Sequence, residues 1–209
     1  MSKIPIAVTI RLPLYYEYLS NMKNQGAKWV SSNMIASSLG LTPSTIRQDI
    51  KYLGKINSSS YGYSTDNFCY VLEKVLGISY GANMALVGVG SLGLALVRYK
   101  GFRQNNFIIK ALFDKRPGLI DAVVENVVVY SVGRLSEIVK REKINIGIIT
   151  TPADVAQQVA NQLIDAKIRG IWNFAPINLR VPESVSLENV TLCPSLFSLA
   201  FKMKSMPSR

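Results

Sequence analysis

The chain has 209 residues, and its composition of 48% hydrophobic and 18% charged residues favours packed cores over a disordered chain. It contains no histidine, which excludes histidine metal sites and Ser-His-Asp triads, and we expect no metal. The formal net charge of +11 favours a polyanionic partner, while short apolar runs and an opening without an apolar leader predict a cytoplasmic protein outside the membrane.

Residues 1–80 are predicted to form a DNA-binding domain of the winged helix-turn-helix type. Apolar side chains recur at helical spacing over Leu12–Met22. Ser31 offers an N-cap for a second helix, which Gly40 ends. Thr42-Pro43 is typical of the start of a third helix. Two helices joined by a tight turn that contains glycine are the pattern of the helix-turn-helix motif.

The third helix is the candidate DNA-reading element. An apolar stripe that includes Ile46 and Ile50 leaves Arg47, Gln48 and Lys51 on the other face. There they would reach base edges and phosphates in a major groove. An ordinary solvated helix face would carry the same kinds of residue, so both interpretations stay open for these three.

Downstream of this helix the sequence predicts a wing, a further helix and a linker. The serine- and glycine-rich residues 55–63 predict a β-wing, and a further helix is expected over Asp66–Leu76. Residues 77–81 then link the DNA-binding domain to a second domain.

Residues 81–193 are predicted to form a Rossmann-like domain with a parallel sheet, so the fold class is α/β. Short β-rich runs alternate there with helical stretches, which is typical of a sheet covered by helices on both faces. We expect the helix within residues 194–209 to mediate dimerisation, because its apolar face has no place in the sheet. The expected strands are Met84–Val87, Ile108–Phe113, Val127–Tyr130, Ile146–Thr150 and Gly170–Phe174, and the expected helices are Leu92–Tyr99, Val132–Glu142, Val155–Lys167 and Ser195–Met203.

The most specific motif is the run of residues 88–93, Gly-Val-Gly-Ser-Leu-Gly, which follows an apolar strand and precedes a helix. Gly88 makes the tight turn, Gly90 lets a pyrophosphate approach the backbone, and Gly93 allows close helix–strand packing. The helix N-terminus supplies N–H groups to the phosphates. Asp114, at the end of the next strand, is the acid that accepts hydrogen bonds from the ribose hydroxyls. The pattern predicts NAD(H) binding, and the neighbouring cations at 115 and 116 leave a 2′-phosphorylated cofactor open.

In its motifs the chain resembles the Rex family of redox-sensing repressors, and the resemblance covers nearly all of the sequence. The matching stretches are Arg11-Leu12-Pro13-Leu14-Tyr15-Tyr16, Val30-Ser31-Ser32, Thr45-Ile46-Arg47-Gln48-Asp49-Ile50, Gly62-Tyr63, the glycine turn, Tyr99 with Gly101-Phe102, Thr151-Pro152-Ala153, Asn173-Phe174-Ala175-Pro176 and Ser198-Leu199-Ala200-Phe201.

The resemblance implies a homodimer that exchanges its C-terminal helices, binds operator DNA in the presence of NAD⁺ and leaves it when NADH binds. It places Tyr99 near the nicotinamide. The residues expected at the cofactor are Gly88, Val89, Gly90, Ser91, Leu92, Gly93, Tyr99, Asp114, Lys115, Thr151, Pro152, Asn173, Phe174, Ala175 and Pro176. The residues expected at the DNA are Arg11, Ser44, Thr45, Arg47, Gln48, Lys51, Tyr52, Lys55, Ser59 and Tyr63.

At four places the sequence departs from the family pattern. Gln48 stands where a second cation is usual, and Ser58-Ser59-Ser60-Tyr61 stands in the wing where a basic pair is usual. Thr191 stands where an aspartate takes part in an interface switch with the N-terminal arginine. Arg116 replaces the second acid after the nucleotide-binding strand.

Two alternatives to a redox-sensing repressor stay open. The departures motivate a family paralogue with altered operator binding or redox response. A small NAD-dependent oxidoreductase would need a substrate domain and a proton donor near the nicotinamide. Because the chain offers a helix-turn-helix in place of such a domain, and no histidine, we expect no catalytic residues and no enzyme.

Overall fold

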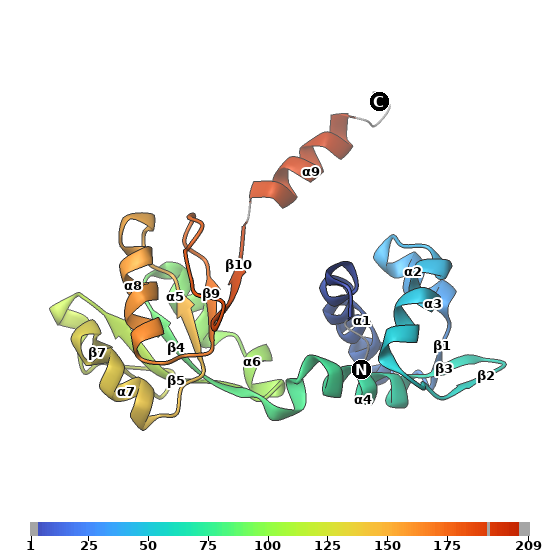
Figure 1. Cartoon of the computed structure of the whole chain (residues 1–209), viewed down its shortest axis with the longest axis horizontal. Helices are drawn as coiled ribbons and strands as arrows, with labels where there is room; N and C mark the ends of the chain where they lie inside the picture. Colours follow the sequence, from blue (N-terminus) through green and yellow to red (C-terminus); the bar gives the residue numbers. More distant parts are fainter. Residues whose placement is uncertain (1–3, 192, 205–209) are drawn as a thin grey trace. The chain divides into compact units, whose positions relative to one another are not determined.

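The computed structural model describes residues 4–191 and 193–204. It divides into two compact units, Met1–Tyr80 and Gly81–Arg209. Each unit encloses its own hydrophobic core. Figure 1 labels most of the helices and strands of both units.

The N-terminal unit consists of helices around one core and a small antiparallel sheet. The predicted helix-turn-helix and wing are both confirmed. Its elements are α1 (Ile6–Asn24), β1 (Trp29–Val30), α2 (Ser32–Leu39), α3 (Pro43–Ile50), η1 (Lys51–Leu53), β2 (Ser58–Ser59), β3 (Gly62–Ser64), α4 (Thr65–Leu76) and η2 (Ile78–Tyr80).

Helix α1 begins at Ile6, whereas the sequence pattern predicted a start at Leu12. Val8 is buried on the same face as Leu12, so the packed stripe extends a turn further towards the N-terminus than the prediction allowed. Pro13 lies inside the helix, where a proline removes one backbone hydrogen bond. Packing of the buried face against the core outweighs that cost.

The turn between α2 and α3 is fixed by its caps. The Ser31 hydroxyl accepts a hydrogen bond from the Met34 N–H at 3.1 Å. Gly40 ends α2 with φ of 65°, the left-handed conformation that glycine adopts most easily. The Thr42 hydroxyl accepts from the Thr45 N–H at 3.2 Å and starts α3. These contacts confirm the predicted helix boundaries.

The wing is a short hairpin joined to the rest of the unit through its second strand. In the three-stranded sheet, β3 pairs with β2 on one side and with β1 on the other, both antiparallel. Gly62 has φ of 118°, and a Cβ there would lie 2.4 Å from the carbonyl oxygen of Val30. A side chain at this position would therefore push the wing away from β1.

The second unit is a parallel sheet with helices on both faces, as predicted. Its remaining elements, up to the final helix, are β4 (Ala82–Val87), α5 (Ser91–Arg98), α6 (Gly101–Gln104), β5 (Phe107–Asp114), η3 (Pro117–Leu119), β6 (Val123–Val124), β7 (Val127–Ser131), η4 (Val132–Arg134), α7 (Leu135–Arg141), β8 (Ile146–Ile149), α8 (Ala153–Asp165), β9 (Gly170–Asn173) and β10 (Ser186–Asn189). The final helix is α9 (Cys193–Lys204).

The strand order is β10-β9-β8-β4-β5-β7-β6. Strand β4 therefore lies between β5 and β8, and the chain runs outward from it in both directions, which is the topology of the Rossmann fold. In such sheets a ligand binds beyond the carboxyl ends of the strands, at the point where the strand order reverses. That point lies between the carboxyl ends of β4 and β8 in this chain.

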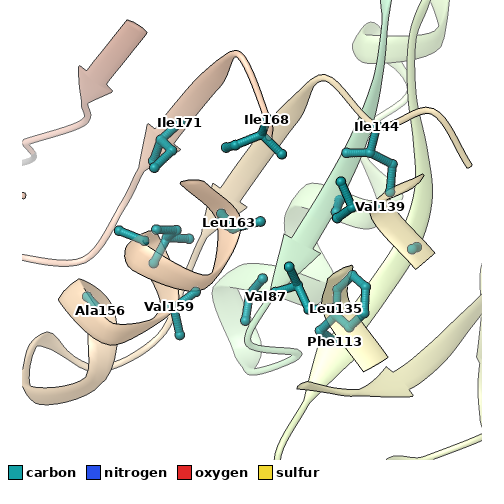
Figure 2. Packing of buried hydrophobic residues seen from close by; sticks show 14 of the residues in the cluster. Val87, Phe113, Leu135, Val139, Ile144, Ala156, Val159, Leu163, Ile168 and Ile171 are labelled. Carbon is teal, nitrogen blue, oxygen red and sulfur yellow. The ribbon is translucent and has the colours of Figure 1, made fainter. Parts of the chain in front are cut away.

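Alternate residues of β4 face opposite sides of the sheet and enter different cores. Ala85 and Val87 pack with residues of α7 and α8, and Figure 2 shows Val87 beside Leu135 and Phe113 in this layer. Met84 and Leu86 belong to the second cluster, against which side chains of α5 pack. Both faces of the central strand are thus buried, as expected for a doubly covered parallel sheet.

Besides the short turn η3, the sequence pattern missed two strands and one helix of this unit. Strand β10 is an edge strand of alternating exposed and half-buried residues, so it has no apolar run. Strand β6 has two residues and pairs antiparallel with β7, and α6 has one turn. Helix α7 begins at Leu135, where the prediction began at Val132, because a 3-10 turn precedes it. Short elements leave little periodicity to detect.

Candidate functional site

The glycine turn joins β4 to α5 at the switch point of the sheet. Gly88 has φ of 103°, and Gly93 is buried so closely against the turn that a Cβ would lie 2.2 Å from the Gly88 carbonyl oxygen. Both positions therefore require glycine for the local backbone. A Cβ at Gly90 would meet no atom within 4 Å. Since folding does not require glycine at position 90, the open space beside it is available to a ligand.

A cavity of about 440 Å³ lies against this turn. The Thr150 hydroxyl, which lines the cavity, donates a hydrogen bond to the Gly88 carbonyl oxygen at 2.7 Å and so links the residue after β8 to the glycine turn. The Thr151 hydroxyl is buried and has no hydrogen-bond partner among the described residues. A buried polar group without a partner is costly, so a ligand that reaches Thr151 satisfies it. The lining residues are Val87, Gly88, Gly90, Asp114, Lys115, Arg116, Val132, Thr150, Thr151, Pro152, Val155, Gln158, Val159 and Gln162.

Asp114, the last residue of β5, lines the cavity. Its carboxylate accepts a hydrogen bond from the Val89 N–H at 2.8 Å, and the Arg116 side chain donates to both of its oxygens at 2.9 and 2.8 Å. The Arg116 hydrogen bonds hold the pKa of Asp114 at about 2, with help from the backbone N–H groups of Arg116 and Val89 and against the effect of burial. The carboxylate is therefore ionised and already paired.

The predicted cofactor residues fall into two groups. Gly88, Gly90, Asp114, Lys115, Thr151 and Pro152 line the cavity. The others do not line it. Tyr99 is 60% exposed and lines a separate hollow of about 170 Å³ at the end of α5. The fully buried Asn173 donates to the carbonyl oxygens of Ala175 and Ile177, which fixes the backbone after β9.

The remaining predicted cofactor residues lie near these two groups. Val89 is buried at the turn, and Ser91 and Leu92 are exposed in the first turn of α5. Phe174 packs edge-on against Trp172 with ring centroids 4.7 Å apart, while Ala175 is buried and Pro176 is exposed.

Helix α3 presents a polar face to solvent in the N-terminal unit. Ser44, Arg47 and Gln48 are exposed on it, while Ile46 and Ile50 are buried in the core. Lys51, Tyr52, Lys55 and Ser59 continue the exposed polar surface into η1 and the wing. The structure thus brings most of the predicted DNA-binding residues onto exposed surface along α3, η1 and β2.

Several predicted DNA-binding side chains make hydrogen bonds or ring contacts within the unit, Thr45, Tyr63 and Arg11 among them. Thr45 shares a hydroxyl hydrogen bond with Thr42 at 2.9 Å. Tyr63 packs edge-on against Phe68, with ring centroids 5.7 Å apart. Arg11 donates from Nε and Nη2 to the Asp49 carboxylate at 2.7 and 2.8 Å. These side chains position α3 and the wing, whatever further contacts they make.

Asp49 is a buried charged residue of this unit to which the sequence motifs assigned no role of its own. It is 3% exposed and accepts from Arg11 and from the Tyr15 hydroxyl, at 2.6 Å. Burial raises the pKa of Asp49, but the hydrogen bonds from Arg11 and Tyr15 outweigh it and leave that pKa lowered. Burial, followed by the hydrogen bond to Asp49, raises the pKa of Tyr15. A charged residue at a core-facing helix position was the available signal.

Two further features were not predicted from the sequence, the exposed Tyr61 and the unpartnered Thr151 hydroxyl. Tyr61 is 76% exposed at the tip of the β2–β3 hairpin, and in the sequence it was noted only as part of a departure from the family pattern. The orphan hydroxyl of Thr151 was beyond sequence reasoning, because a missing hydrogen-bond partner is a property of the folded surroundings. Arg47 donates weakly to the Ser32 hydroxyl at 3.3 Å, and its side chain is otherwise exposed.

Comparison with known sequences identifies both units. Residues 3–50 match a family model described as the N-terminus of putative DNA-binding proteins, and residues 79–177 match a CoA binding domain. The redox-sensing transcriptional repressor Rex of Desulfitobacterium hafniense is 41% identical over 201 residues, 96% of each chain. The chain belongs to the Rex family. The Rex protein of Clostridioides difficile is 39% identical over the same share of both chains.

Solved Rex-family structures agree with the fold over nearly all of the chain. The crystal structure of the Rex-family repressor RSP has a TM-score of 0.90 and 36% identity, and the match covers 98% of this chain and 96% of RSP. RSP has also been solved with NAD⁺ and operator DNA, with a TM-score of 0.88 over 94% of that chain. A third structure contains NADH, with a TM-score of 0.89. These Rex relatives are named as repressors and not as enzymes.

The described residues show neither a metal-binding cluster nor a membrane-spanning helix. Residues 4–191 and 193–204 contain no group of three or more acidic or cysteine residues that could hold a metal ion. No helix in the same ranges is long and apolar enough to cross a membrane.

Proposed function

We propose that this Rex-family chain acts as a homodimer that binds operator DNA through its N-terminal unit and leaves the DNA when NADH binds in its Rossmann unit. The observation that carries the proposal is the cavity at the glycine turn, with an unpartnered buried Thr151 hydroxyl, in the same chain as an exposed polar recognition helix. In this proposal residues 1–80 form the DNA-binding domain, residues 81–193 the dinucleotide-binding domain and residues 194–209 the dimerisation helix. The protein acts in the cytoplasm.

The cavity suits a dinucleotide for three reasons. The N-terminus of α5 has no side-chain cap at Gly90, so its first N–H groups are available to phosphate. The space beside Gly90 admits the pyrophosphate, and Thr151 lies ready to bond a polar ligand atom. The nucleotide acts as a regulatory ligand here, and the residues lining the cavity contribute binding and orientation. The proposed cofactor residues outside the cavity, Tyr99 and Asn173–Pro176, would meet the nicotinamide end.

On the DNA side, we assign the major-groove contacts to α3. Arg47 and Gln48 are exposed at the middle of the helix, where side chains reach base edges, while Lys51 and Lys55 meet phosphates. The Arg11–Asp49 pair holds α3 against α1, so the exposed face is presented by a fixed helix.

The dimer contact is assigned to α9. Five apolar side chains of this helix are between 52% and 72% exposed: Leu196, Phe197, Leu199, Phe201 and Met203. A surface of this kind marks a protein interface. A second copy of the chain supplies an equivalent helix, which is the exchange that the resemblance to the family implies.

The experiment that tests the DNA half starts from a random pool of duplexes. The purified full chain is used with NAD⁺ to select a duplex over repeated rounds, and the affinity for that duplex is measured by fluorescence anisotropy at fixed salt. We expect selection of one sequence and an affinity at least about a thousandfold above that for a scrambled duplex. Failure to enrich any sequence would rule out an operator-binding repressor and leave the alternative of a paralogue without that function.

The description of the matched CoA binding domain suggests a second ligand for the same cavity. CoA and NADH share an adenosine diphosphate half, and the glycine turn would hold either one. A competition experiment between CoA and NADH distinguishes the two ligands. NADH is expected to displace bound CoA at lower concentration than CoA displaces NADH, and the reverse order would make CoA the ligand.

A further inference from the structure

The end of the cavity around Asp114 differs from an ordinary NAD site. In Rossmann folds an acid at this strand end accepts hydrogen bonds from the ribose hydroxyls of NAD, whereas an arginine nearby accommodates the 2′-phosphate of NADP. Here the acid and the arginine are both present and are bonded to one another. The contacts of this pair decide which of the two nucleotides the site admits.

The Asp114 carboxylate has no acceptor site left for a ribose hydroxyl. Its Oδ1 accepts from the backbone N–H and the Nε of Arg116, at 3.0 and 2.9 Å. Its Oδ2 accepts from the Val89 N–H and from Nη2 of Arg116, both at 2.8 Å. A carboxylate offers about four lone-pair sites. All four are used, so a ribose hydroxyl would have to displace one of these partners.

The Arg116 guanidinium is held in place with one of its nitrogens unused. Nη2 donates to the Val89 carbonyl oxygen at 2.9 Å as well as to Asp114. The two N–H groups of Nη1 have no acceptor among the residues that the structure describes. The side chain is 54% exposed and lines the cavity. A fixed arginine with free donors suits a phosphate better than a hydroxyl.

The local charge points the same way. Asp114, Lys115 and Arg116 are the charged residues that line the described cavity, so it carries two cations against one carboxylate. Lys115 is exposed and adds a second donor beside Arg116. A doubly charged 2′-phosphate would meet a net positive environment, and the Asp114 charge is already compensated by its partner.

We infer that the ribose end of this cavity accepts a 2′-phosphate, so that the chain binds NADPH as well as NADH, with Arg116 as the residue that determines this specificity. The inference rests on the proposed function, because it concerns the same nucleotide cavity. It departs from an NAD-only sensor, in which the acid at this position receives the ribose and repels a phosphate.

The test is a direct titration of the purified full chain with NADH and with NADPH, in which binding is measured by isothermal titration calorimetry. The quantity of interest is the ratio of the NADPH Kd to the NADH Kd. We expect a ratio within about tenfold of one for the natural chain. In Arg116→Ala the Asp114 carboxylate is released towards the ribose and the phosphate loses its partner, so the ratio should rise by at least about tenfold.

Two further variants complete the design. Arg116→Gln keeps a hydrogen-bond donor without the charge and should raise the ratio in the same direction. Lys110→Ala removes a cation from an exposed position on β5, away from the cavity lining, and should leave the ratio unchanged. Circular dichroism of each variant establishes that the fold is retained.

The outcomes separate the inference from the function on which it rests. Binding of neither nucleotide overturns the proposed function itself. Tight NADH binding with NADPH weaker by more than about a hundredfold leaves the sensor in place and overturns the inference. Similar affinities that do not respond to either Arg116 variant also overturn it, because the specificity would then lie elsewhere.

Discussion

The Arg11 guanidinium on α1 and the Asp49 carboxylate on α3 form a two-point ion pair, with N–O distances of 2.7 and 2.8 Å. The Tyr15 hydroxyl donates to the same carboxylate. The pair joins the first helix to the helix that presents Arg47 and Gln48 to solvent. Its strength therefore governs how firmly the proposed DNA-reading face is held.

Replacing Asp49 with asparagine should destabilise the N-terminal unit. The variant leaves Arg11 with a weaker partner and a buried amide in place of the carboxylate, at a cost on the order of 2 kcal/mol. Chemical denaturation followed by circular dichroism measures the loss. Gln48→Ala, one position away and exposed, serves as the control and should change stability by less than about 0.5 kcal/mol. Equal stability of the two variants would show that the ion pair does not stabilise the N-terminal unit.

Arg47 should contribute to operator affinity through the base contact assigned to it. Arg47→Ala is expected to weaken operator binding by about 1–3 kcal/mol and to relax the specificity at one base position. A uniform loss of affinity across sequences, with the slope of log K against log salt reduced by about one, would indicate a phosphate contact instead. Lys74→Ala, on α4, removes the same charge elsewhere in the unit. An equal effect of both variants would mean that net charge alone is responsible.

Alanine substitutions at Gly93 and at Gly90 should have different effects. Gly93→Ala places a Cβ 2.2 Å from the Gly88 carbonyl oxygen, so the Rossmann unit should lose stability. Gly90→Ala meets no atom within 4 Å and should fold normally, yet lose at least about tenfold in NADH affinity because the new methyl group occupies the pyrophosphate space. Thermal unfolding and nucleotide titration distinguish them. Normal NADH affinity in Gly90→Ala would place the ligand elsewhere.

The stability of the Rossmann unit should depend on Asp114 in acid. The pKa of Asp114 in the folded chain, about 2, lies below its ordinary value. The ionised carboxylate therefore contributes stability that is complete above about pH 4 and is lost as the pH falls through the folded-state pKa. Urea denaturation between these values should show this fall in the natural chain and a flatter profile in Asp114→Asn. Identical profiles would contradict the assignment.

The assembly prediction concerns α9. Phe197→Glu puts a charge into the exposed apolar face of that helix, and burying an unpaired charge at an interface is strongly unfavourable. Sedimentation equilibrium should show a dimer for the natural chain and a monomer for the variant. Lys204→Ala, at the end of the same helix, should remain dimeric. A natural chain that sediments as a monomer would remove the dimer from the account.

The sequence predicted what depends on local patterns. Thr42 and Gly40 fixed the ends of α2 and α3 because capping acts within one turn of helix. The glycine turn was predicted because Gly88 and Gly93 are required by the backbone itself. Such signals need no knowledge of distant parts of the chain.

Contacts that depend on the folded surroundings escaped prediction. The pairing of Asp114 with Arg116, two positions further on, depends on side-chain geometry after the strand ends. Asp49 meets Arg11 across 38 positions of sequence, so no spacing rule reveals the pair. Strand β10 joins the sheet by pairing with β9, although its own residues alternate only weakly.

The most direct test of the account is the affinity for the selected operator duplex in NAD⁺ and in NADH, at one stated salt concentration. Coupling between nucleotide and DNA sites is typically worth 1–3 kcal/mol, so we expect NADH to weaken operator binding by at least about tenfold relative to NAD⁺. Operator affinities that are equal in the two nucleotides, with both nucleotides bound, would contradict a redox-sensing repressor.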